Sequence, residues 1–223
     1  MTRIQKYIFT FSGLAGLIAS FFSPVLLPYP IFVMAVLRGW RLPKIGAPAL
    51  QLLLSTSLCT LLLETSAWLD NFLKNSPDPI LLHPQLFPDL IMSIGIYSAW
   101  WLSWWLILRY FHFSIKAVFF TTGFYGVFIE QQGAVFLSGL SNFPFGIVWW
   151  LFVAVVYGST MALAVFLVRD QINASRNSWI KYPLALGSLF IFTFSTSLAW
   201  GAILELIDII PPPKLPMWDH PFW

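Results

Sequence analysis

The chain has 223 residues, of which 58% are hydrophobic and only 9% are charged, and its formal net charge is +3. Soluble domains carry about 25% charged residues, so this chain has too few charges to cover a surface that faces water. The composition predicts an integral membrane protein whose first partner is the lipid bilayer. It argues against a nucleic-acid partner, because the net positive charge is small.

The first apolar segment spans residues 7–37 and is too long for one straight transmembrane helix, which needs roughly 20 residues. Proline breaks or kinks a helix interior, and this segment contains Pro24, Pro28 and Pro30. Two structures remain open. One is a single long, kinked span, and the other is a re-entrant hairpin whose two arms, 8–22 and 31–38, meet at the prolines.

Further apolar segments along the chain are long enough to cross a bilayer as helices. They lie at about 47–67, 88–108, 115–138, 145–168 and 184–207. Together with the first segment they predict an all-α, polytopic integral membrane helical bundle with about six membrane segments, the first one kinked or re-entrant. Because no linker or low-complexity stretch divides the chain, we expect residues 1–223 to form a single transmembrane domain.

Basic residues are concentrated in alternate loops. One set of loops carries Arg38, Arg41, Lys44, Arg109, Lys116, Arg169, Arg176 and Lys181, whereas the loops at 69–87 and 139–144 carry almost no basic residues. By the positive-inside rule the first set is cytoplasmic, so we predict a multi-pass protein of the plasma or inner membrane with a non-cytoplasmic C-terminus. Arg3 and Lys6 favour an inside N-terminus, which suits the hairpin alternative, because a single span would place them outside.

The stretch GFYGVFIEQQGAVF at 123–136 places a carboxylate in the middle of an apolar run. If this stretch is a continuous helix, one face carries Glu130 together with Gly123, Gly126, Gly133 and Ala134. Small residues allow neighbouring membrane helices to approach closely, so we expect this face to pack against protein. A charge at the bilayer centre costs about 2.5–3.5 kcal/mol, and burial against protein reduces that cost.

Two other segments also carry acids. In segment 47–67, Ser57, Thr60 and Glu64 form one polar stripe, and Glu205 lies near the end of the last segment. With the predicted orientation these segments and that of Glu130 run in the same direction, so their acids lie in the outer half of the membrane. We therefore expect one outward-facing site, with ligand-binding or ion-binding candidates Glu130, Gln131, Glu64 and Glu205.

Known motifs of metal or nucleotide chemistry are not found in this sequence. It contains no H-E-x-x-H motif, no carboxylate–histidine pair with helical spacing inside a segment, and no glycine fingerprint for nucleotides. The sequence therefore indicates no metal site, and it assigns no cofactor.

Three functions fit these features. The first is a small membrane protein that binds a hydrophobic or cationic ligand, or acts as an accessory or assembly subunit of a membrane complex. The second is a membrane-embedded enzyme that acts on a lipid or isoprenoid, with Glu130 as general acid. The third is a proton-coupled or cation-coupled transporter. We expect the partners to be a hydrophobic small molecule, another membrane protein or a second copy of the chain.

Overall fold

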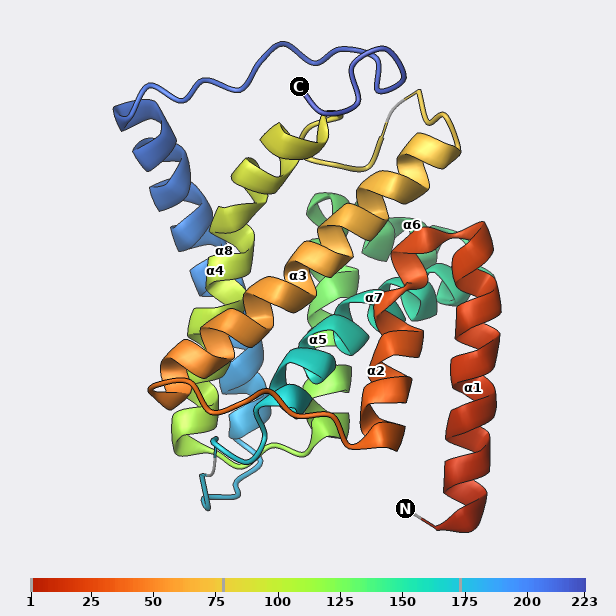
Figure 1. Ribbon diagram of the computed structural model, residues 1–223, viewed down its shortest axis with the longest axis vertical. Helices are drawn as coiled ribbons and strands as arrows, with labels where there is room; N and C mark the ends of the chain where they lie inside the picture. The colour runs from red at the N-terminus through yellow and green to blue at the C-terminus, as the bar shows by residue number, and fades with distance from the viewer. Residues whose placement is uncertain (1, 78, 173) are drawn as a thin grey trace.

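The computed structural model describes residues 2–77, 79–172 and 174–223, and every regular element in these ranges is a helix. The predicted all-α class is therefore confirmed. Four described helices are long and apolar enough to cross a membrane, which supports the predicted helical membrane bundle (Figure 1). They are α3 (Pro48–Leu73), α4 (Leu86–Tyr110), α7 (Gly146–Leu167) and α8 (Lys181–Leu206).

The first apolar segment forms a helical hairpin. Helix α1 (Arg3–Phe22) and helix α2 (Pro28–Arg38) lie side by side and are joined by the short helix η1 (Pro24–Leu26) (Figure 1). Pro24 and Pro28 each begin an element, where the missing N–H group costs no hydrogen bond. The prolines thus mark a turn between two helices and do not kink one long span.

Close contact between α1 and α2 depends on a glycine and a tyrosine. A Cβ atom at Gly13 would lie 2.5 Å from Cγ1 of Val33, so only glycine allows this approach. The Tyr29 hydroxyl donates a hydrogen bond of 2.9 Å to Oγ of Ser12. These contacts hold the two arms together over several turns.

The predicted segment 115–138 is not one helix. Helix α5 (Ile115–Ile129) ends one residue before Glu130, the short helix η2 (Glu130–Gly133) follows, and helix α6 (Ala134–Ser141) then begins. Gln131 and Gln132 have φ angles of 49° and 56°. Such left-handed residues cannot continue a right-handed helix, so the helical face predicted across this segment is broken at Glu130.

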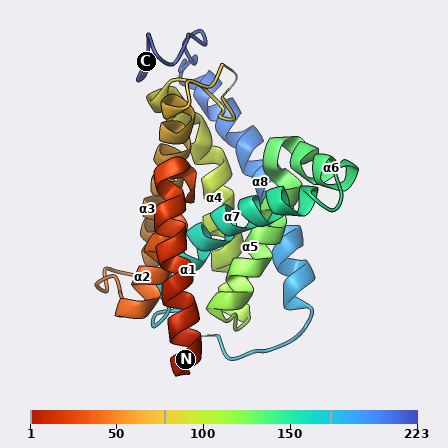
Figure 2. The same ribbon diagram turned by 90° about the vertical axis from the view of Figure 1, so that its right-hand side faces the viewer.

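Helix α6 projects from one side of the bundle next to α7 (Figure 2). Helix α5 has 15 residues, which corresponds to about 22 Å at 1.5 Å per residue. This is shorter than the roughly 30 Å hydrocarbon core of a bilayer. The chain therefore turns sideways at η2 before α7 returns.

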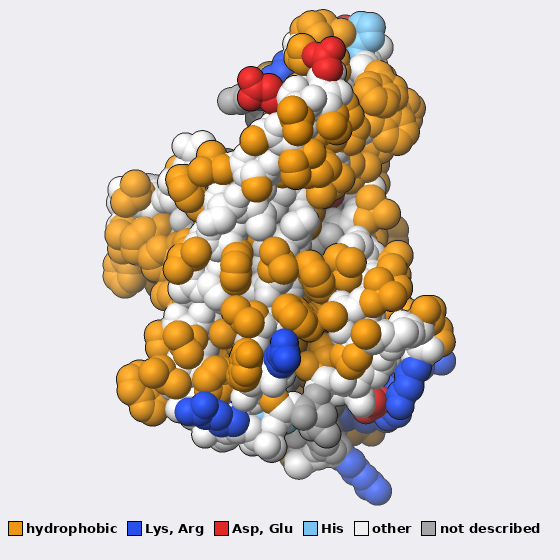
Figure 3. Space-filling view, turned by 90° about the vertical axis from the view of Figure 1, so that its left-hand side faces the viewer, with side chains coloured by type: hydrophobic (Ala, Val, Ile, Leu, Met, Phe, Trp, Pro, Cys, Tyr) orange, Lys and Arg blue, Asp and Glu red, His pale blue; other side chains and the backbone are white. Residues whose placement is uncertain are grey.

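The two ends of the bundle differ in charge. The N-terminus and the loops that follow α2, α4 and α7 lie at the lower end in Figure 1, and the C-terminal tail (residues 207–223) and the loop between α3 and α4 lie at the upper end. Most of the lysine and arginine on the face in Figure 3 gathers at its lower end, where Arg41 pairs with Asp170, whereas most of the acidic side chains on this face lie at its upper end. This arrangement follows the alternation of basic loops in the sequence.

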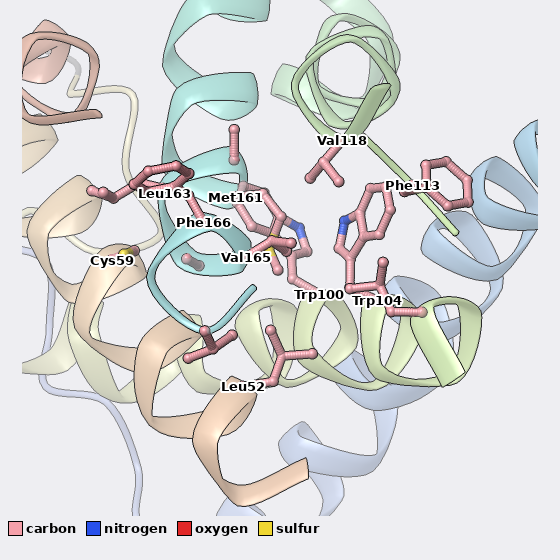
Figure 4. Close-up of a cluster of buried hydrophobic side chains, with 14 of the residues drawn as sticks. Leu52, Cys59, Trp100, Trp104, Phe113, Val118, Met161, Leu163, Val165 and Phe166 are labelled. Carbon is pink, nitrogen blue, oxygen red and sulfur yellow. The ribbon is translucent and has the colours of Figure 1, made fainter. Parts of the chain in front are cut away.

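The core lies where α4, α5 and α7 meet. Trp100 and Trp104 stand one turn apart on α4, are 0% and 1% exposed, and point toward α5 and α7 (Figure 4). Val118 of α5 and Met161 of α7 pack around them, and α3 contributes the fully buried Leu52. This core holds α3 and α4 side by side, and the main candidate site lies between these two helices.

Candidate functional site

Glu64 of α3 is buried and bound by two hydroxyl groups. Its side chain is only 8% exposed. The Ser93 hydroxyl donates a hydrogen bond of 2.9 Å to Oε1, and the Tyr97 hydroxyl donates one to Oε2. Ser93 and Tyr97 are four residues apart on α4 and therefore face the same side of that helix. Glu64 is thus held by neutral donors.

A second buried carboxyl group lies one helical turn before Ser93 on α4. Asp89 lies in the first turn of α4 and is fully buried. Its Oδ1 atom accepts a hydrogen bond of 3.0 Å from the His83 backbone N–H, and its Oδ2 atom accepts none from the described residues. Asp89 lies four residues before Ser93, whose hydroxyl binds Glu64, so Asp89 and Ser93 share one side of α4.

The sequence analysis did not include Asp89 among the candidate site residues. A sequence signal for it nevertheless exists. Asp89, Ser93 and Tyr97 are spaced four residues apart, so they form a polar stripe along α4 that matches the stripe of Ser57, Thr60 and Glu64 on α3.

An open cavity of about 340 Å³ lies between α3 and α4 and is lined in part by Glu64. We call it the α3–α4 groove. Its polar lining includes Ser57, Thr60, Glu64, Ser93 and Tyr97, and its apolar lining includes Leu61, Leu90 and Ile94. Leu61 and Ile94 are 49% and 43% exposed, so the groove opens on the apolar surface of the bundle. Its volume lies within the range of small-molecule sites.

The C-terminal tail packs against the loop that leads into α4. The buried His83 ring binds the Pro212 carbonyl oxygen through Nε2 at 2.9 Å, and its Nδ1 accepts a hydrogen bond of 3.2 Å from the Gln85 N–H. The Leu86 backbone N–H donates a hydrogen bond of 3.1 Å to the Pro221 carbonyl oxygen. These contacts lie directly before Asp89 in the chain, so the tail covers the start of α4.

Aromatic rings fasten the tail to α3. The Phe72 ring lies 4.4 Å from that of Trp218, and the Trp68 ring lies 6.0 Å from that of Phe222, measured between centroids. The Trp68 indole N–H donates a hydrogen bond of 3.0 Å to the carbonyl oxygen of Pro84. The C-terminal tail and the loop before α4 are therefore both packed against α3.

Glu130 occupies a different setting. It is half-buried in η2, at the end of α5, and accepts a hydrogen bond from the hydroxyl of Tyr157 on α7. Gly126 makes room for this tyrosine, because a Cβ atom there would lie 2.5 Å from Cγ of Tyr157. Gly123 packs against α7 in the same way, with its Cβ position 2.6 Å from the Ala154 carbonyl oxygen.

The other predicted members of that face lie beyond the helix break. Gly133 has a φ angle of 91° and belongs to the turn, and Ala134 is exposed at the start of α6. Gln131 is exposed and its backbone is left-handed. The structure therefore brings Gly123, Gly126 and Glu130 together against α7 and places the remaining residues elsewhere.

Aromatic rings fill the space between the sites of Glu64 and Glu130. Ring centroids are 5.4 Å apart for Tyr97 and Trp100, and 5.2 Å apart for Trp100 and Tyr157. The two glutamates thus lie at opposite ends of an aromatic band that crosses the bundle from α3 to η2.

Glu205 lies apart from both. Helix α8 packs on α4. In this contact the Trp200 indole N–H donates a hydrogen bond of 2.7 Å to the Ile91 carbonyl oxygen. Beyond this contact α8 diverges from α4 (Figure 1), and Glu205 is exposed. In the part of the chain that the structure describes, its carboxylate accepts no side-chain hydrogen bond.

Within residues 2–77, 79–172 and 174–223, no three His, Cys, Asp or Glu side chains lie close enough together to hold a metal ion. Comparison with protein-family models, with curated proteins and with solved structures gives no significant match for this chain.

Proposed function

We propose that this protein is a multi-pass membrane protein that binds a lipophilic small molecule in the α3–α4 groove, with a cationic or hydrogen-bond-donating head group at Glu64. The observation that carries the proposal is the juxtaposition of a buried carboxylate and an apolar cavity that opens toward lipid. Ligand sites commonly combine apolar walls with a few convergent polar groups.

The Glu64 carboxylate has hydrogen-bond acceptor positions left for a ligand. An ionised carboxyl group offers about four lone-pair positions, and Ser93 and Tyr97 each occupy one of those of Glu64. An intramembrane acid is costly unless it is compensated, and it commonly marks a functional site. A ligand head group would provide that compensation, while its chain would extend between Leu61 and Ile94 into the bilayer.

We further propose that the basic end of the bundle faces the cytoplasm in the plasma or inner membrane. The positive-inside rule supports this orientation. It places the N-terminus inside, and it places the C-terminal tail outside. Cysteine accessibility at Asn142 and Ser178, in loops at opposite ends of α7, would test it in intact cells, since reagent should reach Asn142→Cys from outside and Ser178→Cys only after permeabilisation.

Binding can be measured in nanodiscs with radiolabelled dodecyltrimethylammonium, a cationic amphiphile, after subtraction of binding to empty nanodiscs. We expect a saturable component of one probe per chain. Glu64→Gln should weaken it at least tenfold, because the probe loses its ion-pair partner. The matched control is Glu205→Gln, which removes an exposed acid outside the groove and should leave the affinity unchanged. Equal affinity of Glu64→Gln and the unaltered protein would contradict the proposal.

A second candidate function is an enzyme that acts on a lipid or isoprenoid with Glu130 as general acid. Gln131 and Gln132 both adopt left-handed backbone conformations beside it, and such strain is often found at functional sites. The Tyr157 hydroxyl would orient the carboxyl group. Mass spectrometry of membrane lipids from cells that express the protein tests this function, because a product should be lost in Glu130→Gln and kept in Glu205→Gln at equal expression.

A role in a larger membrane complex is the remaining candidate, and the exposed outer face of α8 favours it. Only 17% of the most apolar stretch of this helix is buried within the bundle. A membrane-protein partner or a second copy of the chain would cover this face. Purification in mild detergent tests this role, because a stoichiometric partner or a dimer should be recovered, and Phe194→Ser on that face should release it.

A further inference from the structure

A second cavity, of about 200 Å³, lies at the basic end of the bundle, between the start of α3, the end of α4 and the loop that follows α7. Arg109 is the only ionisable side chain among its described lining residues, and we call this cavity the Arg109 pocket. It shares no described lining residue with the α3–α4 groove. Most small-molecule sites have roughly 300–1,000 Å³, so this smaller pocket suits one compact polar group.

Two glutamines hold the loop wall of the pocket against α3. The Gln171 side-chain amide, which lines the pocket, donates a hydrogen bond of 3.1 Å to the side-chain oxygen of Gln51. The Gln51 amide in turn donates a hydrogen bond of 2.9 Å to the Pro43 carbonyl oxygen, and Gln51 is only 2% exposed. The walls of the pocket are therefore fixed by contacts within the protein.

The positive charge of Arg109 is not balanced by an acid of the described residues. Its guanidinium forms no ion pair there, and its Cζ atom lies 5.7 Å from the ring centroids of both Trp105 and Tyr110. Asp170, which directly precedes Gln171 in the loop, is already paired with Arg41 at 2.8 Å. The pocket therefore carries one positive charge whose N–H groups are open to a ligand.

A phosphate group matches this charge and geometry. The planar guanidinium of arginine can donate two parallel hydrogen bonds to phosphate oxygens. Much of the remaining lining is apolar and includes Leu52, Trp105 and Leu108, which suits the first carbon atoms attached to a lipid phosphate. Basic pockets between transmembrane helices on the cytoplasmic side commonly bind anionic lipid head groups.

We propose that the Arg109 pocket binds the head group of one anionic phospholipid, with its phosphate on Arg109 and its acyl chains extending past Trp105 into the bilayer. Charge favours an anionic lipid over a zwitterionic one. The cationic group of a zwitterionic lipid would need an acid beside the pocket, and Asp170 is already bound to Arg41. The site is separate from Glu64, so the inference does not depend on the function proposed for the α3–α4 groove.

Native mass spectrometry of the delipidated protein in dodecyl maltoside counts bound lipids directly. Dioleoylphosphatidylglycerol is the anionic probe, and dioleoylphosphatidylcholine, which has the same acyl chains, is the zwitterionic control. We expect one phosphatidylglycerol per chain to bind in preference to phosphatidylcholine. Arg109→Gln should weaken this binding by about tenfold, the factor typical for the loss of a hydrogen bond to a charged group, and should remove the preference.

The matched control is Arg38→Gln. Arg38 is also an arginine in the last turn of a helix at the basic end, but it is exposed and lies outside the pocket, so the affinity should stay nearly unchanged. A further variant, Ala174→Phe, keeps Arg109 and narrows the pocket from the loop. It should weaken phosphatidylglycerol binding at an unchanged melting temperature.

Three results would overturn the inference. The first is equal binding of the two lipids by the unaltered protein, and the second is an equal loss of binding in Arg109→Gln and Arg38→Gln. The third is displacement of the lipid by an equimolar amount of inorganic phosphate, which would identify a soluble phosphate as the ligand of Arg109.

Discussion

The surroundings of Glu64 and Glu130 share one feature and differ in backbone structure and burial. Each glutamate accepts a hydrogen bond from a tyrosine on a neighbouring helix, Tyr97 for Glu64 and Tyr157 for Glu130. Glu64 is buried inside the continuous helix α3 and accepts a second hydrogen bond from Ser93. Glu130 lies where α5 breaks, half-buried and beside exposed glutamines.

This comparison shows how differently one bundle can surround two glutamates. Near Glu64, a cavity lies between α3 and α4, and two hydroxyl groups bind the carboxyl group. Near Glu130, the chain changes direction, and the tyrosine bond joins η2 to α7. The Glu130 bond thus joins two parts of the fold, whereas Glu64 borders a cavity.

The largest expected effect is on the α5–α7 contact beside Glu130. Gly126→Leu would force a side chain into the Tyr157 ring, whose Cγ lies 2.5 Å from the Cβ position. Overpacking costs typically about 1–3 kcal/mol, and this contact is tight enough to reach the upper end. Thermal unfolding in detergent should show a loss of several degrees.

The control for this change is Gly201→Leu on α8, where no atom lies within 4 Å of the Cβ position. Both variants place leucine in a membrane helix, so the difference between them isolates the helix contact. Equal melting temperatures would mean that α5 and α7 do not pack as described.

Removing each tyrosine hydroxyl compares the two regions directly. Tyr97→Phe leaves the buried Glu64 with one donor fewer, and hydrogen bonds to charged groups contribute about 1.5–3 kcal/mol. Tyr157→Phe affects the half-buried Glu130, which solvent or lipid head groups can reach, so its cost should be below about 1 kcal/mol. Denaturant unfolding in mixed micelles measures both variants, and a larger loss for Tyr157→Phe would reverse the proposed ranking.

Deleting the tail after Ile210 should produce a local change. The backbone N–H groups of Leu86 and Phe87 donate to the carbonyl oxygens of Pro221 and Phe222, and these bonds would be lost. We expect faster hydrogen exchange at both amides and unchanged exchange in α5 and α7. Exchange measured by mass spectrometry would contradict the capping role if the loop before α4 stayed equally protected.

The sequence predicts much of the fold because apolar length and proline positions act locally. Pro24 and Pro28 mark the hairpin turn, and the polar stripe of Ser57, Thr60 and Glu64 identifies one wall of the groove. These features depend on neighbours within a few turns of helix.

The break at Glu130 and the role of Asp89 depend on distant contacts. Gln131 and Gln132 adopt a conformation that glutamine rarely takes, and only the following Gly133 hints at a turn. The burial of Asp89 requires the tail, more than one hundred residues later, to fold over the loop before α4. A helical projection of the sequence shows neither the helix break at Glu130 nor the burial of Asp89. The sequence analysis therefore made Glu130 the main candidate residue and did not select Asp89.

Photoaffinity labelling tests the central claim most directly, because it locates the ligand without any variant. An alkylammonium probe with a diazirine on its chain would be irradiated with the protein in nanodiscs, with an excess of unlabelled dodecyltrimethylammonium as competitor. We predict that the competed labels fall on the groove-facing residues of α3 and α4 listed above, among them Leu61, Leu90 and Ile94. Competed labels around Glu130, or labels spread evenly over the lipid-facing surface, would contradict the account.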